Sequence, residues 1–205
     1  ASGDGLTGKY YNNAERTDAG YVFTRTDATV NFDWVDASPS TDPMIDADTF
    51  GIIWTGEIKP EFTETYTFKT VTNNGVKLYV NGTLLIDDFL PYGDGKGGTQ
   101  TGTIALTAGT RYSIQMEYYE WLGNAYAKLY WSSASQAEEI IPQARMWRMA
   151  DPGATAVDEI GGNDGTYAGG VTKDITGAIE DDADTAATFD GVDGLVNCGT
   201  LGNFG

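Results

Sequence analysis

The sequence predicts an all-β fold, and three observations lead to this prediction. The 205 residues include 27 glycines, with many Asn, Asp and Thr, which indicates many turns. Several short segments alternate apolar and polar residues, the period of a half-buried strand. No long segment has helical periodicity, and 40% hydrophobic residues are typical of a globular chain. An all-β protein is therefore expected.

The first half of the chain reads as short strands separated by turns. Tyr66, Phe68 and Thr70 share one face of their strand because alternate side chains point the same way. Asn81-Gly82 predicts a tight hairpin turn, since both residues tolerate positive φ. The segment 36–48 is rich in Ser, Pro and Asp and is expected to be a loop; a cation site there is the alternative, although its spacing matches no EF-hand. The predicted strands are 5–11, 21–23, 30–34, 50–58, 65–71, 75–80 and 84–86.

The second half continues the pattern. The glycine-rich segment 89–98 is expected to be a surface loop, and it lacks the strand-to-helix context of a phosphate-binding loop. A long strand over 111–119 is followed by a tight loop at 120–124 and a partner strand at 125–131. Another strand is predicted at 101–106, and 140–142 closes the domain. The tryptophans expected in the core are Trp34, Trp54 and Trp131.

Composition excludes several functions. The formal net charge is −18, so nucleic acid is an unsuitable partner, because phosphate binding needs a basic face. No apolar segment approaches the length of a membrane span, so membrane insertion is not expected, and the first residues do not resemble a signal peptide. The chain has no histidine, which removes Ser-His and Cys-His catalytic pairs. The single cysteine, Cys198, permits no intrachain disulfide.

Two adjacent carboxylates, Asp87 and Asp88, stand at the end of the hairpin that follows Asn81-Gly82. Two like charges side by side are unfavourable unless a cation or hydrogen-bond donors lie between them. The residues alone leave two interpretations open. The pair binds a divalent cation, or it is an acidic strand end that hydrogen-bonds its own turn.

The order of the motifs resembles the PA14 domain, a β-sandwich module of bacterial toxins, glycosidases and adhesins that is related to yeast lectins. The resemblance covers about residues 5–147 and implies an antiparallel β-sandwich. The chain departs from the family at Asn73-Asn74, where an acidic pair is usual, and at Phe89, where Trp is frequent. The segments that carry the resemblance are 5–11, 54–60, 66–68, 74–82, 85–88, 106–109, 116–120, 127–131 and 141–142.

In lectin-type members of this family, adjacent aspartates joined by a cis peptide bind one calcium ion, which coordinates sugar hydroxyls. The resemblance thus implies Ca²⁺ as cofactor, with Asp87 and Asp88 as carboxylate ligands in a cis pair. The loop from Trp121 to Asn124 would supply the Asn124 side chain and the carbonyls of Trp121 and Gly123. Calcium's 6 to 8 oxygen ligands leave room for two sugar hydroxyls.

The same loop is expected to contact the sugar. Trp121 is either a platform for a sugar face or a clamp on a core edge. Leu122 and Gly123 lie beside it, and Asn124 is either a ligand or a loop residue in left-handed conformation. Tyr92 is a candidate for the rim of the site.

The composition changes after Pro142. Segments 158–167 and 187–196 resemble the start of a laminin-G or concanavalin-like jelly-roll domain. The predicted domains are a PA14-like sandwich at 1–147, and a linker with a truncated laminin-G-like start at 148–205. The tail would contain two or three strands, which pack on the sandwich or pair with another copy, so that a weak or swapped dimer is an open alternative.

The expected function is that of a calcium-dependent lectin module of a large bacterial adhesin, secreted or at the cell surface. Its partners would be a glycan or simple sugar and other domains of the same longer chain. The alternative is a non-binding spacer or an accessory domain of a secreted glycoside-active enzyme. Catalysis by the chain itself is not expected, because adjacent aspartates on one strand end cannot flank a glycosidic bond.

Overall fold

The computed structural model describes residues 3–41, 44–89 and 97–148 with their side chains. It describes five strands of the tail by their backbone alone. The chain divides into two compact units, Ala1–Met149 and Ala150–Gly205. The sequence places this division after residue 147, two residues earlier than the structure does.

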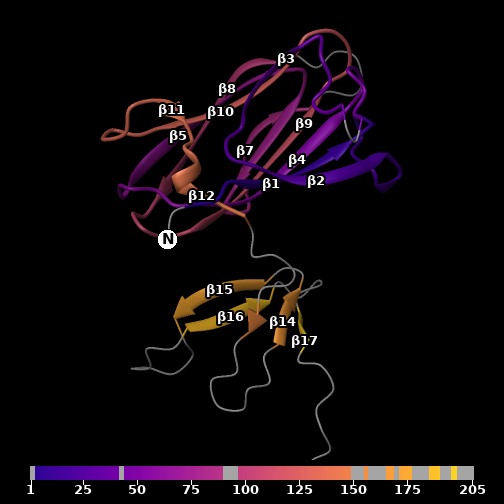
Figure 1. The fold of residues 1–205 in the computed structure, drawn as a ribbon. Coiled ribbons are helices and arrows are strands. Elements are labelled where there is room, and N and C mark those ends of the chain that lie inside the picture. Colours follow the sequence, from indigo (N-terminus) through magenta and orange to yellow (C-terminus); the bar gives the residue numbers. More distant parts are fainter. Residues whose placement is uncertain are drawn as a thin grey trace, which may run out of the picture. The chain divides into compact units, whose positions relative to one another are not determined.

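The first unit is a sandwich of two antiparallel sheets (Figure 1). This confirms the prediction of an all-β, antiparallel sandwich. The larger sheet has the order β2-β1-β4-β9-β6-β7. The short strand β12 pairs with the last two residues of β4, Glu57 and Ile58. Its strands are β1 (Leu6–Tyr11), β2 (Tyr21–Asp27), β4 (Gly51–Ile58), β6 (Val76–Val80), β7 (Thr83–Asp88), β9 (Tyr112–Tyr119) and β12 (Met146–Trp147).

The smaller sheet has the order β11-β10-β5-β8, and β3 also pairs with β10. Two short 3₁₀ turns complete the unit, at Asp18–Gly20 and Gln143–Arg145. No helix in the described part of the chain is long and apolar enough to cross a membrane. The strands of the smaller sheet are β3 (Asn31–Val35), β5 (Glu64–Asn73), β8 (Gly98–Leu106), β10 (Ala125–Ser132) and β11 (Glu139–Ile140).

Local sequence accounts for most of these strands. Tyr66, Phe68 and Thr70 are all buried, as the alternation of β5 predicts. Asn81 and Gly82 have φ values of 51° and 70°, so the predicted hairpin turn is confirmed between β6 and β7. The strand predicted at 21–23 runs on to residue 27, because β1 supplies hydrogen-bonding partners along its whole length.

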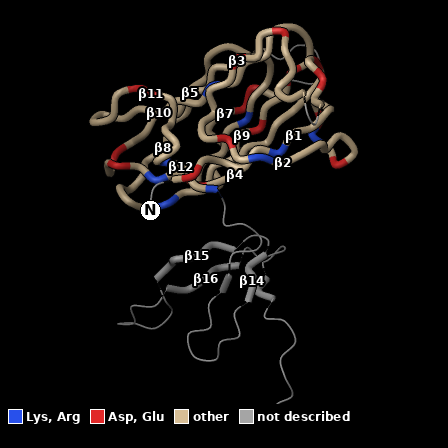
Figure 2. The backbone as a smooth tube through the Cα atoms, viewed as in Figure 1, with Lys and Arg blue, Asp and Glu red and all other residues tan. Residues whose placement is uncertain are grey.

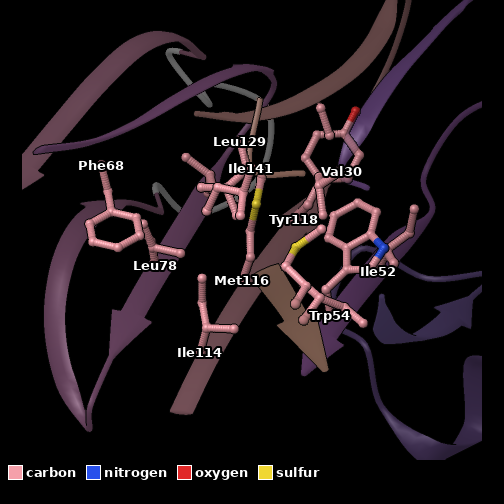
Figure 3. Packing of buried hydrophobic residues seen from close by; sticks show 14 of the residues in the cluster. Val30, Ile52, Trp54, Phe68, Leu78, Ile114, Met116, Tyr118, Leu129 and Ile141 are labelled. Carbon is pink, nitrogen blue, oxygen red and sulfur yellow. The ribbon is translucent and has the colours of Figure 1, made fainter. Parts of the chain in front are cut away.

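The inward faces of the two sheets form one core (Figure 3). Trp54 and Trp131 are fully buried, and Trp34 is partly buried against the same core, as predicted from the sequence. Tyr118 lies among these rings, with its centroid 6.1 Å from that of Trp34 and 5.9 Å from that of Phe50. Aromatic side chains therefore fill the interior near the end of β9.

One buried carboxylate braces the larger sheet. Asp27 accepts hydrogen bonds on Oδ2 from the Tyr10 hydroxyl at 2.6 Å and from Trp54 Nε1 at 2.7 Å. Its Oδ1 accepts from Arg25 Nε at 2.7 Å, and the Arg25 guanidinium lies 4.4 Å from the centre of the Tyr10 ring. Because each donor comes from β1, β2 or β4, this cluster ties three neighbouring strands together.

The second unit contains two small antiparallel sheets. Its described residues form five strands, more than the two or three predicted from the sequence. The resemblance of this region to a laminin-G-like domain stays a prediction. The strands are β13 (Thr155–Ala156), β14 (Gly165–Ala168), β15 (Val171–Thr176), β16 (Thr185–Phe189) and β17 (Leu195–Asn197), in the orders β13-β14-β17 and β15-β16.

Candidate functional site

The predicted carboxylate pair ends strand β7, where its two side chains point to opposite faces. Asp87 is exposed, and its Oδ1 lies 3.9 Å from Lys77 Nζ on the neighbouring strand. Asp88 is buried, and no hydrogen-bond partner lies near its Oδ2. Successive residues of a strand diverge in this way. The structure therefore does not bring the two carboxylates together.

The predicted cis bond between Asp87 and Asp88 is wrong. Among the described residues the cis peptide bond joins Asn73 and Asn74. Asp87 and Asp88 instead continue the regular pairing of β7 with β6, where they oppose Lys77 and Val76. Both aspartates oppose single residues of β6, and a trans bond is the ordinary geometry of such a paired strand.

The outer face of the larger sheet accounts for the exposed member of the pair. One row of opposing residues crosses the sheet from β1 to β7. It consists, in order, of Lys9, Ile53, Glu117, Lys77 and Asp87. Basic and acidic positions are interleaved over this unit rather than separated onto two faces (Figure 2). Asp87 is thus a member of an alternating surface row, which is a common arrangement on exposed sheets.

The predicted sugar-contacting loop, Trp121 to Asn124, follows the end of β9. Trp121 is partly exposed, Leu122 has 62% of its surface exposed, and Asn124 is exposed. Gly123 has a φ of 94° and open space where a Cβ would stand. The loop therefore presents an indole, an aliphatic side chain and an amide at one end of the sandwich.

Two side chains from distant segments hold this loop. Asn74 Oδ1 accepts a hydrogen bond from the Trp121 backbone N–H at 2.8 Å. Asp48 Oδ1 accepts one from the Gly123 N–H at 3.0 Å. The Trp121 carbonyl in turn accepts from the Thr49 N–H at 3.1 Å. The loop is thereby fixed from the β5–β6 turn on one side and from the segment before β4 on the other.

A buried acid lies directly before the loop. Glu120 is fully buried, and its Oε1 has no hydrogen-bond partner. Its Oε2 lies 3.3 Å from the Tyr118 hydroxyl, which also donates to the Asn73 carbonyl. Burial raises the pKa of Glu120 to about 8, and the negative charge of Asp48 acts in the same direction. A carboxyl with a pKa near 8 keeps its proton through much of the neutral range.

The sequence reasoning located the loop but missed the residues that hold it. Asp48 lies in the Ser-, Pro- and Asp-rich segment 36–48, for which the sequence predicts a loop or, as the alternative, a cation site. Asn74 stands out in the sequence as a departure from the family pattern, with no predicted contact to the loop. Glu120 was read as the first residue of a tight loop. No local signal connects these residues, because Asp48 is 75 positions from Gly123. Tyr92, the predicted rim residue, lies outside the described residues.

Calcium at this end of the sandwich stays a prediction. Within residues 3–41, 44–89 and 97–148, no group of three or more His, Cys, Asp or Glu side chains is placed to hold a metal ion. The oxygens of Asn74 and Asp48 face backbone N–H groups of the loop. The side-chain oxygens that the structure brings to the loop thus do not fit the carboxylate cage expected from the resemblance.

Comparison with known proteins places the chain. The PA14 domain family matches residues 2–145. The chain is 43% identical over 151 residues to the anti-sigma-I factor RsgI3 of Acetivibrio thermocellus. The matched region covers 74% of this chain and 22% of that protein. A solved anti-sigma factor domain-containing protein is 42% identical with a TM-score of 0.66, over 72% of this chain and 49% of that one. The chain therefore spans only part of these relatives.

A more distant solved structure has the same fold. The PA14 sugar-binding domain of an RTX adhesin is 21% identical with a TM-score of 0.54, over 73% of this chain and all of that one. At this identity the similarity concerns the fold alone. A sugar-binding adhesin domain is thus a neighbour in fold, whereas two relatives above 40% identity are anti-sigma factor proteins.

The predicted extracellular or cell-surface location is wrong in the light of these relatives. The location was predicted on the assumption that the domain belongs to an adhesin. The relatives at 42% and 43% identity are anti-sigma factor proteins instead. The physical reason is that one fold serves in many proteins, so that a domain does not fix the protein that carries it. The family itself is settled by the match over residues 2–145 and by the two-sheet sandwich, and the chain belongs to the PA14 domain family.

Proposed function

We propose that the first unit is a carbohydrate-binding module of a regulatory protein of the anti-sigma factor kind. Its ligand would be a glycan that contacts the loop from Trp121 to Asn124. The observation that carries the proposal is a partly exposed indole on a loop fixed by hydrogen bonds from two other segments. The sugar-binding PA14 domain of the RTX adhesin, which shares this fold, adds support.

The chemistry of the loop suits a sugar. The faces of pyranose rings carry C–H groups that pack on aromatic rings, and Trp121 offers such a surface. Asp48, Asn74 and Asn124 add oxygen and nitrogen atoms at the same end, which hydroxyl groups can use as partners. A loop that is already held in place loses little entropy on binding, which favours affinity.

The comparison with RsgI3 indicates how such a module would serve. The matched region is 22% of that protein, so the chain would be one segment of a larger regulator. Sugar binding by this segment would then be the input that the rest of the protein converts into control of a sigma factor. This chain would take no part in catalysis.

The test is isothermal calorimetry of the 205-residue chain against a panel of neutral and acidic oligosaccharides. At least one glycan should bind, and Trp121→Ala should weaken it about tenfold, since a lost ring contact is worth about 1.4 kcal/mol. Leu84→Ala is the matched control, because Leu84 is an exposed hydrophobic residue of β7. It should leave the affinity unchanged.

Two outcomes would overturn the proposal. Failure of the wild-type chain to bind any glycan of the panel would favour a spacer. Equal affinities of wild type and Trp121→Ala, with a loss in Leu84→Ala, would move the site away from the loop. Unfolding curves of both variants separate a lost contact from a lost fold.

A further inference from the structure

The backbone N–H groups of the loop point at the side-chain oxygens that hold it. Trp121 N–H donates to Asn74 Oδ1, and Gly123 N–H donates to Asp48 Oδ1. Asn74 Oδ1 and Asp48 Oδ1, the oxygens that a cation at the loop would use, therefore each face the positively polarised hydrogen of a backbone N–H. A calcium ion requires 6 to 8 oxygen ligands with no donor hydrogen between them and the ion.

The carbonyl groups near the loop are also engaged. The Trp121 carbonyl accepts from Thr49 N–H at 3.1 Å. The Asn73 carbonyl accepts from the Tyr118 hydroxyl, and the Asn74 carbonyl accepts from Thr72 Oγ1 at 3.0 Å. Each of these three carbonyl oxygens already accepts a hydrogen bond.

The carboxylates expected for the ion lie elsewhere. Asp87 points outward to Lys77, and Asp88 points into the sandwich. In place of an acidic pair the turn before β6 carries Asn73 and Asn74, whose amides bring no negative charge. The described part of the chain therefore offers hydrogen bonds where the family resemblance implies an ion.

We propose that Asp48 and Asn74 are positioning residues that hold the Trp121 to Asn124 loop in place of an ion, so that ligand binding by this chain does not require calcium. The part that concerns ligand binding rests on the proposed function. The part that concerns the loop stands without it, because the hydrogen bonds are present in the protein itself.

The first test follows the two amides by hydrogen–deuterium exchange of the whole chain, with CaCl₂ or with EDTA. The exchange rates of the Trp121 and Gly123 amides should be the same in both buffers. Asn74→Ala should speed exchange at Trp121, and Asp48→Ala at Gly123, each about fivefold or more, the expected effect of one lost hydrogen bond. Asp48→Asn keeps an acceptor oxygen and should keep the slow rate.

A matched control comes from the same segment. Asp36 is an exposed carboxylate of the loop between β3 and β4, so Asp36→Ala removes the same charge as Asp48→Ala. It should leave both amide rates unchanged. Equal acceleration by Asp36→Ala and Asp48→Ala would show that net charge, and not the hydrogen bond, controls the loop, and would overturn the proposal.

The second test is a calorimetric titration with CaCl₂ alone, followed by glycan titration in EDTA. No calcium heat beyond dilution and equal glycan affinity in EDTA are expected. Binding of one calcium ion that slows exchange at Trp121 and Gly123 would overturn the proposal, as would a glycan that binds only with calcium. In the last case the sugar-binding function stands and the proposed independence of calcium fails. If no glycan binds but the exchange rates behave as expected, the positioning role of Asp48 and Asn74 stands and the proposed function fails.

Discussion

Two buried acids of the first unit have opposite surroundings. Asp27, 6% exposed, has donors on both oxygens, from Tyr10, Trp54 and Arg25. Glu120, with no exposed surface, has no partner on one oxygen and a contact of 3.3 Å on the other. The first acid joins three strands of a sheet, whereas the second precedes the candidate ligand loop.

The difference separates scaffold from site. A buried carboxylate with complete hydrogen bonding offsets its loss of water and fixes its neighbours. A buried acid whose donors do not offset its lost hydration keeps a penalty. In Glu120 burial raises the pKa to about 8, although the Tyr118 hydroxyl and the backbone N–H groups of Trp121 and Leu122 act to lower it. Such perturbed groups concentrate at functional sites, because there the arrangement serves ligands as well as stability. The following substitutions test this contrast.

The largest effect is expected for Asp27→Ala. It leaves the Tyr10 hydroxyl, the Trp54 indole N–H and the Arg25 guanidinium without their acceptor. Breaking a buried charged cluster of this kind costs about 3–5 kcal/mol, which urea unfolding would measure. Asp33→Ala is the control, since Asp33 has a 3.1 Å pair with Lys128 at the exposed surface and should cost less than about 1 kcal/mol. A loss below about 1 kcal/mol in Asp27→Ala as well would remove the distinction between the two acids.

An intermediate effect is expected for Glu120→Gln, and it depends on pH. The folded state holds the Glu120 proton up to about pH 8, whereas the unfolded state releases it near the ordinary pKa of 4.5. The contribution of Glu120 to stability is therefore present at low pH and is lost as pH rises between these values. Gln does not titrate, so the variant should gain stability relative to the wild type as the pH rises from about 5 to about 8, by up to about 1.4 kcal/mol per pH unit.

The control for this pH dependence is Glu138→Gln, an exposed acid that pairs with Lys69. Urea unfolding at several pH values should give parallel curves for this variant and the wild type. Parallel curves for Glu120→Gln too would mean that Glu120 is ionised in the folded protein, and the contrast with Asp27 would then disappear.

The smallest effect is expected for Asp87→Ala. The exposed contact with Lys77 at 3.9 Å should contribute less than about 0.5 kcal/mol, and the unfolding midpoint should hardly move in EDTA or in CaCl₂. A loss of more than about 1 kcal/mol that appears only with calcium would identify Asp87 as a metal ligand after all.

Much of the fold could be predicted from local patterns. Alternation placed β5 and the inward face with Phe68, and Asn81-Gly82 placed the β6–β7 hairpin, because strand period and turn conformation depend on neighbouring residues. The extent of β2 could not be predicted, since its last residues are strand only through pairing with β1. For the tail, the sequence predicted two or three strands, whereas the described residues there form five.

The candidate site was only half accessible from the sequence. A loop of Trp, Leu, Gly and Asn between two alternating segments indicated an exposed aromatic, and Trp121 is indeed partly exposed. The adjacent aspartates were misleading as a pair, because a regular strand directs neighbours to opposite faces. The rule applies here because β7 extends through both Asp87 and Asp88, whereas the strand predicted from the sequence ends at residue 86.

The sequence by itself determined the strands, the hairpin turn, the aromatic core and the absence of histidine chemistry, because these depend on residue type and short-range period. Only the tertiary structure decided which polar residues meet. Asn74 reaches Trp121 across 47 positions and Asp48 reaches Gly123 across 75. The order of strands in the two sheets creates these contacts, and strand order is set by the packing of the whole core rather than by any one segment.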